Sequence, residues 1–223
     1  MFINQVNEYY SQIANDELPE ITKNHTYFDF IQTEQDYEKS DRYQKDKSYW
    51  VDKFSTLPEV IGFKSYNPLT LSTAGKRKNI ILEERLYYNL YEFCKQTNSS
   101  MLTVFMTALY IYLHKKTTQN DVSIGTFYAN RITKKEKEML GMFVSTVPTR
   151  VFVDPEMDLL SLLKVVSKEQ VSILRHQRFP YNQMMEDLRE AHQHKDLQRL
   201  FGVSVQYRAM NYSQYENVEI EVD

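Results

Sequence analysis

The chain has 223 residues, with 42% hydrophobic residues, 26% charged residues and a formal net charge of -3. This composition is typical of a globular domain, and the small net charge gives no reason to expect nucleic acid or an anionic membrane as a partner. The single cysteine, Cys94, excludes an internal disulfide. No apolar run approaches the ~20 residues that span a bilayer, and no signal-peptide pattern is present, so we expect a cytoplasmic protein.

The first half of the chain is predicted to be mostly helical. Apolar residues recur at helical spacing between Phe2 and Ile13, which indicates an amphipathic helix. Ser100 is placed to cap a strongly apolar helix that continues to His114 and whose composition predicts deep burial. The other elements predicted here are a polar helix over 34–54, an irregular connection over 58–77, a short strand over 79–83 and a helix over 86–97.

Strands and helices alternate in the second half. The charged run Lys134–Glu138 is predicted to be a solvated loop between two strands. The predicted elements are strands over 122–128 and 147–153, helices over 159–174 and 181–188, and strands over 202–208 and 218–222. This order predicts an α/β sandwich with a sheet on one side and helices on the other.

The segment Leu140–Arg150 is the most informative part of the chain. Gly141 lets a ligand or another chain approach the backbone closely, and Ser145 and Thr146 add hydroxyls to an otherwise apolar surface. Such a surface suits a channel for a long, partly polar substrate. The alternative is a core strand that begins at a glycine and carries incidental hydroxyls.

Several motifs give the chain a resemblance to a known family. Gly141–Thr146 with Arg150 resembles the Ile-Gly-x-Phe-Val-Asn-Thr…Arg motif of condensation domains in nonribosomal peptide synthetases, with Ser145 in place of the usual Asn. Arg178 replaces the acid of a second motif, His-Gln-Asp-x-Pro-Phe. The other pieces that follow the family's order are Tyr27-Phe28-Asp29-Phe30, Tyr49-Trp50, Leu57-Pro58, Asn130-Arg131, His176-Gln177-Arg178-Phe179-Pro180-Tyr181 and Leu200-Phe201.

The resemblance implies both a fold and a function. The fold would be a two-layer α/β sandwich lobe resembling chloramphenicol acetyltransferase. The function would be amide-bond formation between aminoacyl or peptidyl thioesters delivered on the phosphopantetheine of carrier proteins, with no cofactor bound directly. The implied partners are an N-terminal lobe, peptidyl carrier proteins and a neighbouring adenylation domain.

The family's His-His-x-x-x-Asp-Gly signature does not occur in the sequence. We therefore assign no catalytic residue, and we expect residues 1–223 to be a partial condensation domain that is inactive by itself. Residues 1–20 would form a helix continuing from the N-terminal lobe. Two other functions remain open: a non-catalytic module that docks carrier proteins, and an epimerisation-type relative of the same fold.

The resemblance also suggests roles for individual residues, and no metal site. The expected tunnel residues are Gly141, Met142, Phe143, Ser145, Thr146, His176 and Gln177, and the expected structural residues are Tyr27, Asp29, Arg131, Arg150 and Pro180. From residue chemistry alone, His176 either lines the entrance for a carrier arm or, as we favour, interacts with helix C-terminal carbonyls. Scaffolding is favoured over substrate contact for Arg131 and Arg150.

Other residues are assigned by their sequence surroundings. His192 and His194 are expected in an exposed loop, and Cys94 is expected to be a buried, unreactive thiol. Met142 and Phe143 are expected to be exposed where the N-terminal lobe would pack.

Overall fold

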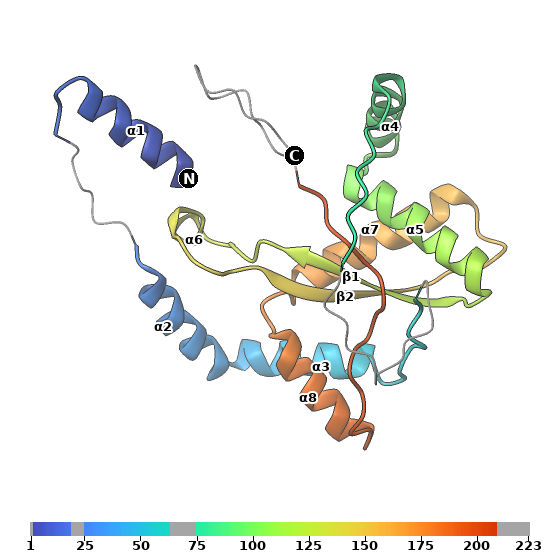
Figure 1. Cartoon of the computed structure of the whole chain (residues 1–223). Coiled ribbons are helices and arrows are strands. Elements are labelled where there is room, and N and C mark those ends of the chain that lie inside the picture. Colours follow the sequence, from blue (N-terminus) through green and yellow to red (C-terminus); the bar gives the residue numbers. More distant parts are fainter. Residues whose placement is uncertain (1, 19–24, 63–74, 209–223) are drawn as a thin grey trace. The chain divides into compact units, whose positions relative to one another are not determined.

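The computed structural model describes residues 2–18, 25–62 and 75–208 of the chain (Figure 1). The chain divides into two compact units. The first unit contains residues 1–57, 127–147 and 172–199, and the second contains residues 58–126, 148–171 and 200–223. The strand predicted over 218–222 lies outside the described residues, as does much of the connection predicted over 58–77.

The first unit is mainly helical. Its helices are α1 (Phe2–Ala14), α2 (Tyr27–Glu38), α3 (Asp41–Lys53), α6 (Lys134–Glu138) and α8 (Tyr181–Ala191). Helix α3 packs against α8, and Trp50 and Phe54 of this region are almost fully buried, with exposed fractions of 1% and 0%. Burial of two such large side chains indicates that α3 is central to this unit's core.

Two predictions for the first unit were wrong. The single helix predicted over 34–54 is interrupted, because the Ser40 side chain accepts a hydrogen bond from the Tyr43 amide and begins α3 anew. The run Lys134–Glu138 forms the short helix α6 rather than a loop. Thr133 and Glu136 form a capping box at its start, and Glu136 is buried.

The second unit packs helices on a small sheet. Its helices are α4 (Glu84–Thr97), α5 (Met101–Thr117) and most of α7 (Leu159–Leu174). The strands β1 (Asp121–Tyr128), β2 (Ser145–Phe152) and β3 (Ser204–Val205) are arranged in the order β2-β1-β3, and β1 pairs with β3 in parallel. The α/β fold class predicted from the sequence is confirmed.

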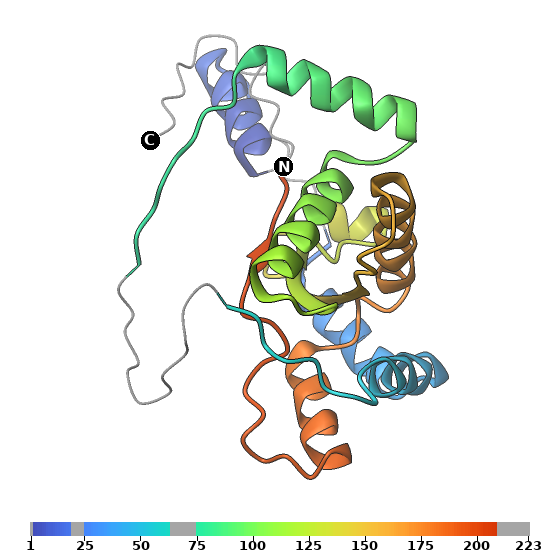
Figure 2. The same ribbon diagram turned by 90° about the vertical axis from the view of Figure 1, so that its right-hand side faces the viewer.

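The core of the second unit lies between the sheet and the helices α5 and α7, which lie side by side in both views (Figures 1 and 2). Met106 and Tyr110 of α5, Val122 and Ile124 of β1 and Val166 of α7 are each at most 2% exposed. The Tyr110 hydroxyl donates to Thr149 Oγ1 at 2.7 Å, so its polar end is satisfied inside this core.

Three expectations for the second unit need correction. Residues 79–83 are exposed and form no strand, and the strand predicted over 202–208 contains only Ser204 and Val205. The apolar helix α5 is not buried all round, because Phe105 and Tyr112 are 38% and 53% exposed.

Among the described helices, none is long and apolar enough to span a membrane.

Candidate functional site

The segment Gly141–Thr146, which we call the glycine segment, is held by an aromatic side chain of α2. A Cβ built on Gly141 would lie 2.2 Å from Cδ2 of Tyr27, so this ring occupies the space that any other residue would fill. The Tyr27 hydroxyl also donates to the Met142 carbonyl at 2.9 Å. The close approach that the glycine permits is therefore made, in this structure, by a residue of the same chain.

Two phenylalanines complete this contact. The rings of Phe30 and Phe143 are 4.2 Å apart, and Tyr27 meets Phe143 edge-on at 5.5 Å. Phe143 is only 4% exposed, so the expectation that it lies on an exposed face was wrong. It points into this small core because Tyr27, Phe30 and Met139 offer it apolar contacts. We call Tyr27, Phe30, Arg131, Gly141 and Phe143 the glycine cluster.

Arg131 connects the cluster to the backbone around it. Its guanidinium donates to the carbonyls of Met139 at 2.6 Å and Gly141 at 3.2 Å, and also to the Glu136 carbonyl. The same group lies over the Phe143 ring, with Cζ 3.9 Å from the ring centroid. A planar donor with several N–H groups is suited to hydrogen-bond several backbone carbonyls of one bend at the same time.

Asp29 stabilises the start of α2, the helix that carries Tyr27. Its carboxylate accepts from the Thr26 amide at 2.7 Å and from the Thr26 hydroxyl at 3.2 Å. The backbone hydrogen bond from Thr26 is the main cause that lowers the pKa of Asp29 below its usual value. The capping carboxylate thus fixes the helix end from which Tyr27 projects.

Exposed apolar side chains adjoin the glycine cluster in sequence, and we call them the apolar rim. Met142 is 76% exposed, Val144 and Leu140 are each 53% exposed, and Phe28 of α2 is 80% exposed. Ser145 and Thr146, the hydroxyl residues expected in the tunnel, are half-buried at the start of β2. The segment therefore alternates between side chains that anchor it and side chains that remain available for contact.

A second group of residues forms around His176, and we call His176, Asp46, Tyr49 and Trp50 the histidine cluster. Nδ1 of His176 donates to the carboxylate of Asp46 at 2.7 Å, and its ring stacks on Tyr49 at a centroid distance of 3.8 Å. The Trp50 indole N–H donates to the His176 carbonyl at 3.1 Å. The side-chain partner of His176 is thus a carboxylate and not the helix carbonyls that the structural prediction invoked.

Asp46 is the residue that sequence reasoning missed. It is 1% exposed and also accepts from the Tyr37 hydroxyl at 2.8 Å and from Arg42 Nε at 3.0 Å. Burial, followed by the hydrogen bond to Asp46, raises the pKa of Tyr37 above its usual range. In the sequence Asp46 lies between lysines in a polar helix and reads as a surface residue.

The residues after His176 pack against α2 and α3. Arg178 pairs with Glu34 at 2.7 Å and lies over the Tyr37 ring at 4.8 Å, which gives a structural partner to the residue that departs from the family motif. Gln177 is half-buried, and Pro180 is the residue immediately before α8. The proline's fixed φ suits a position just outside a helix.

The two arginines that flank the glycine segment in sequence have separate partners. Arg131 binds backbone within the first unit, whereas Arg150 makes a bidentate pair with Asp121 in the second unit, at 2.8 Å from Nε and 2.6 Å from Nη2. That pair joins β2 to β1. The backbone amide of Arg150 also donates to Glu169 Oε1 at 3.2 Å.

The predictions for the other histidines and the cysteine were partly correct. His192 is half-buried and its Nε2 donates to the Phe54 carbonyl at 2.7 Å, so the prediction of an exposed loop was wrong for this residue. His194 is exposed and Cys94 is buried, as predicted. Within the described residues, no group of at least three His, Cys, Asp or Glu side chains is arranged to hold a metal ion.

Several of the motifs that the sequence analysis singled out thus lie together in two clusters. Tyr27-Phe28-Asp29-Phe30, Asn130-Arg131 and the glycine segment meet in the glycine cluster, and Tyr49-Trp50 meets His176 in the histidine cluster. The family model described as the condensation domain matches residues 1–222. The chain belongs to the condensation-domain family.

Known relatives agree with this assignment. The chain is 36% identical over 220 residues to a plipastatin synthase protein of Bacillus subtilis (strain 168), and the match covers 98% of this chain and 8% of that protein. It is 35% identical over 215 residues to a surfactin synthase protein of the same organism, and the match covers 96% of this chain and 6% of that protein. The chain therefore spans less than a tenth of the length of these curated relatives.

Solved structures of condensation domains share the fold. The first condensation domain of the CDA synthetase superposes with a TM-score of 0.77 at 19% identity, covering 93% of this chain and 44% of that chain. The starter condensation domain of rhizomide synthetase gives a TM-score of 0.61 at 22% identity, covering 88% of this chain and 42% of that chain. The fold is accordingly the chloramphenicol acetyltransferase-like fold of this family.

Proposed function

We propose that the chain is the acceptor-side part of a condensation domain that joins carrier-bound aminoacyl or peptidyl thioesters through an amide bond. The family match over residues 1–222 carries the proposal. In the proposed reaction, the acceptor amine attacks the carbonyl of the donor thioester, the carbon–nitrogen bond forms, and the carrier thiol leaves with a proton. The chain's own contribution is to bind and orient the two arms.

The glycine cluster supports a binding role for the segment that follows it. Tyr27 and Arg131 hold the backbone of Gly141 and Met142 from one side, and Met142 and Val144 remain exposed on the other. An apolar rim followed by the hydroxyls of Ser145 and Thr146 suits a phosphopantetheine arm, which is a flexible chain that carries amide groups. No cofactor of the chain's own enters the proposal.

Substitution of Met142 in the full synthetase tests this role. We expect Met142→Trp to lower the rate of dipeptidyl-thioester formation by at least about tenfold, because the larger ring would fill the space of the arm. Amino-acid activation by the neighbouring adenylation domain should stay unchanged. Val171→Trp, at a position that is 49% exposed on α7, is the matched control. Normal condensation by a folded Met142→Trp enzyme would remove the segment from the binding surface.

A second prediction concerns the chain by itself. We expect the 223-residue polypeptide to form no amide bond, because its sequence contains no His-His-x-x-x-Asp-Gly motif. The experiment mixes the chain with two loaded carrier proteins and follows the dipeptidyl thioester by mass spectrometry. Product above the uncatalysed background would show that these 223 residues suffice for the chemistry.

A further inference from the structure

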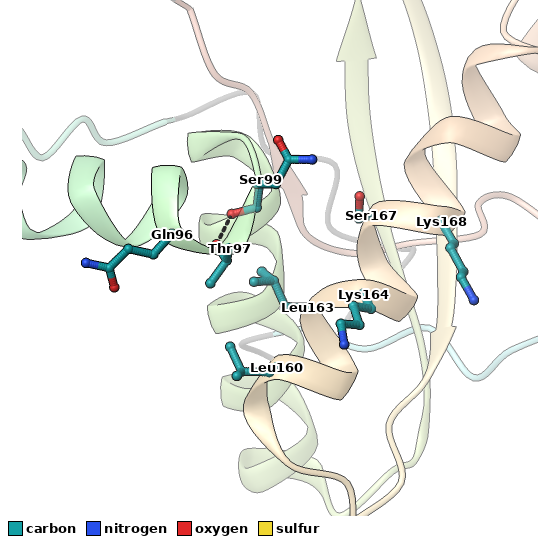
Figure 3. A pocket seen from close by; sticks show the side chains of 9 residues that line it. Gln96, Thr97, Ser99, Leu160, Leu163, Lys164, Ser167 and Lys168 are labelled. Carbon is teal, nitrogen blue, oxygen red and sulfur yellow. Dashed lines mark hydrogen bonds between the residues drawn. The ribbon is translucent and has the colours of Figure 1, made fainter.

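A groove lies within the second unit, between the end of α4 and one side of α7. It has a volume of about 410 Å³. Figure 3 shows Leu160 and Leu163 on the side of α7 that faces the end of α4. The residues that line it are Gln96, Thr97, Asn98, Ser99, Leu160, Leu163, Lys164, Ser167 and Lys168. A volume in this range is typical of sites for small molecules.

The wall formed by α4 is polar but internally satisfied. The Thr97 hydroxyl donates to the Phe93 carbonyl at 2.7 Å, and the hydroxyls of Thr97 and Ser99 are 2.8 Å apart. Because the Thr97 proton is used on Phe93, Ser99 must be the donor in that second bond. This hydroxyl pair therefore has acceptor positions left over but no proton to offer a ligand.

The wall formed by α7 carries uncompensated positive charge. Lys164 and Lys168 are exposed, lie one helical turn apart, and form no ion pair with any residue in the described ranges. Like charges at this spacing repel one another, and a bound anion would relieve the repulsion. Ser167, between them in sequence, adds a hydroxyl to the lining.

The apolar part of the groove comes from two leucines. Leu163 is 4% exposed and forms the floor, whereas Leu160 is 49% exposed and offers its side chain to an occupant. The lining therefore offers aliphatic carbon from the two leucines together with the side chains of two lysines. This combination favours a ligand that has both an apolar part and an anionic part over a purely apolar molecule or a bare inorganic ion.

We propose that this groove is a binding site for a small anion with a short aliphatic tail, and that Lys164 and Lys168 recognise its charged end. The site lies wholly within the second unit and shares no residue with the glycine cluster or the histidine cluster. The proposed site is therefore separate from the residues to which the condensation function is assigned. Carboxylate and phosphate are alternative forms of the charged end.

The test uses hexanoate, hexyl phosphate, 1-hexanol and inorganic phosphate as probes of the whole chain. Saturation-transfer NMR measures each dissociation constant, and amide shifts of Ser99 and Ser167 locate the ligand. We expect at least one of the two hexyl anions to bind about tenfold more tightly than 1-hexanol and than inorganic phosphate, with affinity falling as salt is raised. The stronger of the two anions identifies the headgroup. Equal binding of 1-hexanol, or shifts confined to other amides, would overturn the proposal.

Matched variants separate charge at the groove from charge in general. We expect K164Q/K168Q to weaken binding of the preferred anion about tenfold, while K134Q/K135Q, a pair of exposed lysines on α6, leaves it unchanged. Leu160→Gln should weaken binding without disturbing the buried floor. Equal losses in both double variants, or an unchanged K164Q/K168Q, would show that these lysines do not recognise the ligand.

Discussion

The structure gives Gly141 a role that its sequence motif does not reveal. From sequence, the missing side chain suggests room for a substrate. In the structure that room is taken by the Tyr27 ring, with Cδ2 2.2 Å from the place of a Cβ. The glycine therefore lets the segment lie against α2, and the exposed side chains beside it are those of Met142 and Val144.

This arrangement predicts the effect of the smallest substitution at that position. Gly141→Ala should lower the free energy of unfolding by about 1–3 kcal/mol, because Tyr27 must move from the Phe30 and Phe143 rings. Urea denaturation measures the change. Gly75→Ala is the control, since a Cβ there meets nothing within 4 Å, and it should change stability by less than about 0.5 kcal/mol.

A double-variant cycle identifies the partner. If Tyr27 causes the strain, Tyr27→Ala combined with Gly141→Ala should cost less than the sum of the single changes. Additive losses would show that Gly141 is required for its backbone and not for the space above it.

At the scale of elements, α3 organises the first unit. Its buried face presents Trp50 to the core and Asp46 to His176, while the same helix reaches α8 through Lys47, which donates to the buried Asp187 at 2.8 Å. That hydrogen bond raises the pKa of Lys47. A helix that looks polar in sequence thus binds two distant parts of the chain through its charged residues.

The buried carboxylate of this helix gives the second stability prediction. Asp46→Ala should lower the free energy of unfolding by about 2–3 kcal/mol, because the buried Tyr37 hydroxyl and His176 lose a hydrogen-bond acceptor and Arg42 loses its charge partner. Thermal or urea denaturation measures the loss. Asp52→Ala, at an exposed position of the same helix, should have little effect. Equal effects of the two changes would contradict the role given to Asp46.

The elements were predictable where periodicity was strong. The sequence predicted helices at α1, α4, α5, α7 and α8 and strands at β1 and β2, close to the bounds observed. Two misses had readable signals: Ser40 as the cap that divides α2 from α3, and the capping box formed by Thr133 and Glu136 at α6. Residues 79–83 have strand-like composition, but composition does not supply the neighbouring strand that pairing requires.

The sites were less predictable, because they depend on contacts between distant residues. Family motifs pointed to Tyr27, Arg131 and Gly141, but nothing in the sequence shows that the first lies against the third. His176 was singled out, yet its partner Asp46 is 130 positions away and its sequence neighbourhood is that of a solvated face. Whether a charged side chain is buried depends on contacts with residues distant in the sequence, and the local sequence pattern does not show these contacts.

At the scale of the whole molecule, several exposed apolar side chains lie close in sequence to the motifs of the first unit. Phe28, Ile132 and Met142 are 80%, 55% and 76% exposed. Soluble monomers seldom leave large apolar patches uncovered. We propose that the N-terminal lobe expected for this family covers them. Burying ~400 Å² of apolar surface would contribute about 10 kcal/mol before the costs of association.

The chain alone should therefore associate weakly with itself. We expect its mass by light scattering on a sizing column to rise with concentration, and to rise less when a polypeptide of the N-terminal lobe is added. Phe28→Ser with Met142→Ser should reduce the association, whereas Leu18→Ser, at a position that is 96% exposed, should not. A constant monomer mass at every concentration would show that these side chains do not mediate self-association.

The buried indole of α3 gives the molecule a built-in optical reporter. Trp50 is the sole tryptophan of the sequence, is 1% exposed and donates to the His176 carbonyl, so its emission should be blue-shifted in the folded chain. Seventeen tyrosines are spread along the rest of the sequence, but excitation at the red edge of the absorption band selects the indole alone. Fluorescence therefore follows the histidine cluster and its unit, while circular dichroism follows the helices of the entire chain. Comparing the two signals during unfolding distinguishes a local opening around His176 from unfolding of the whole chain.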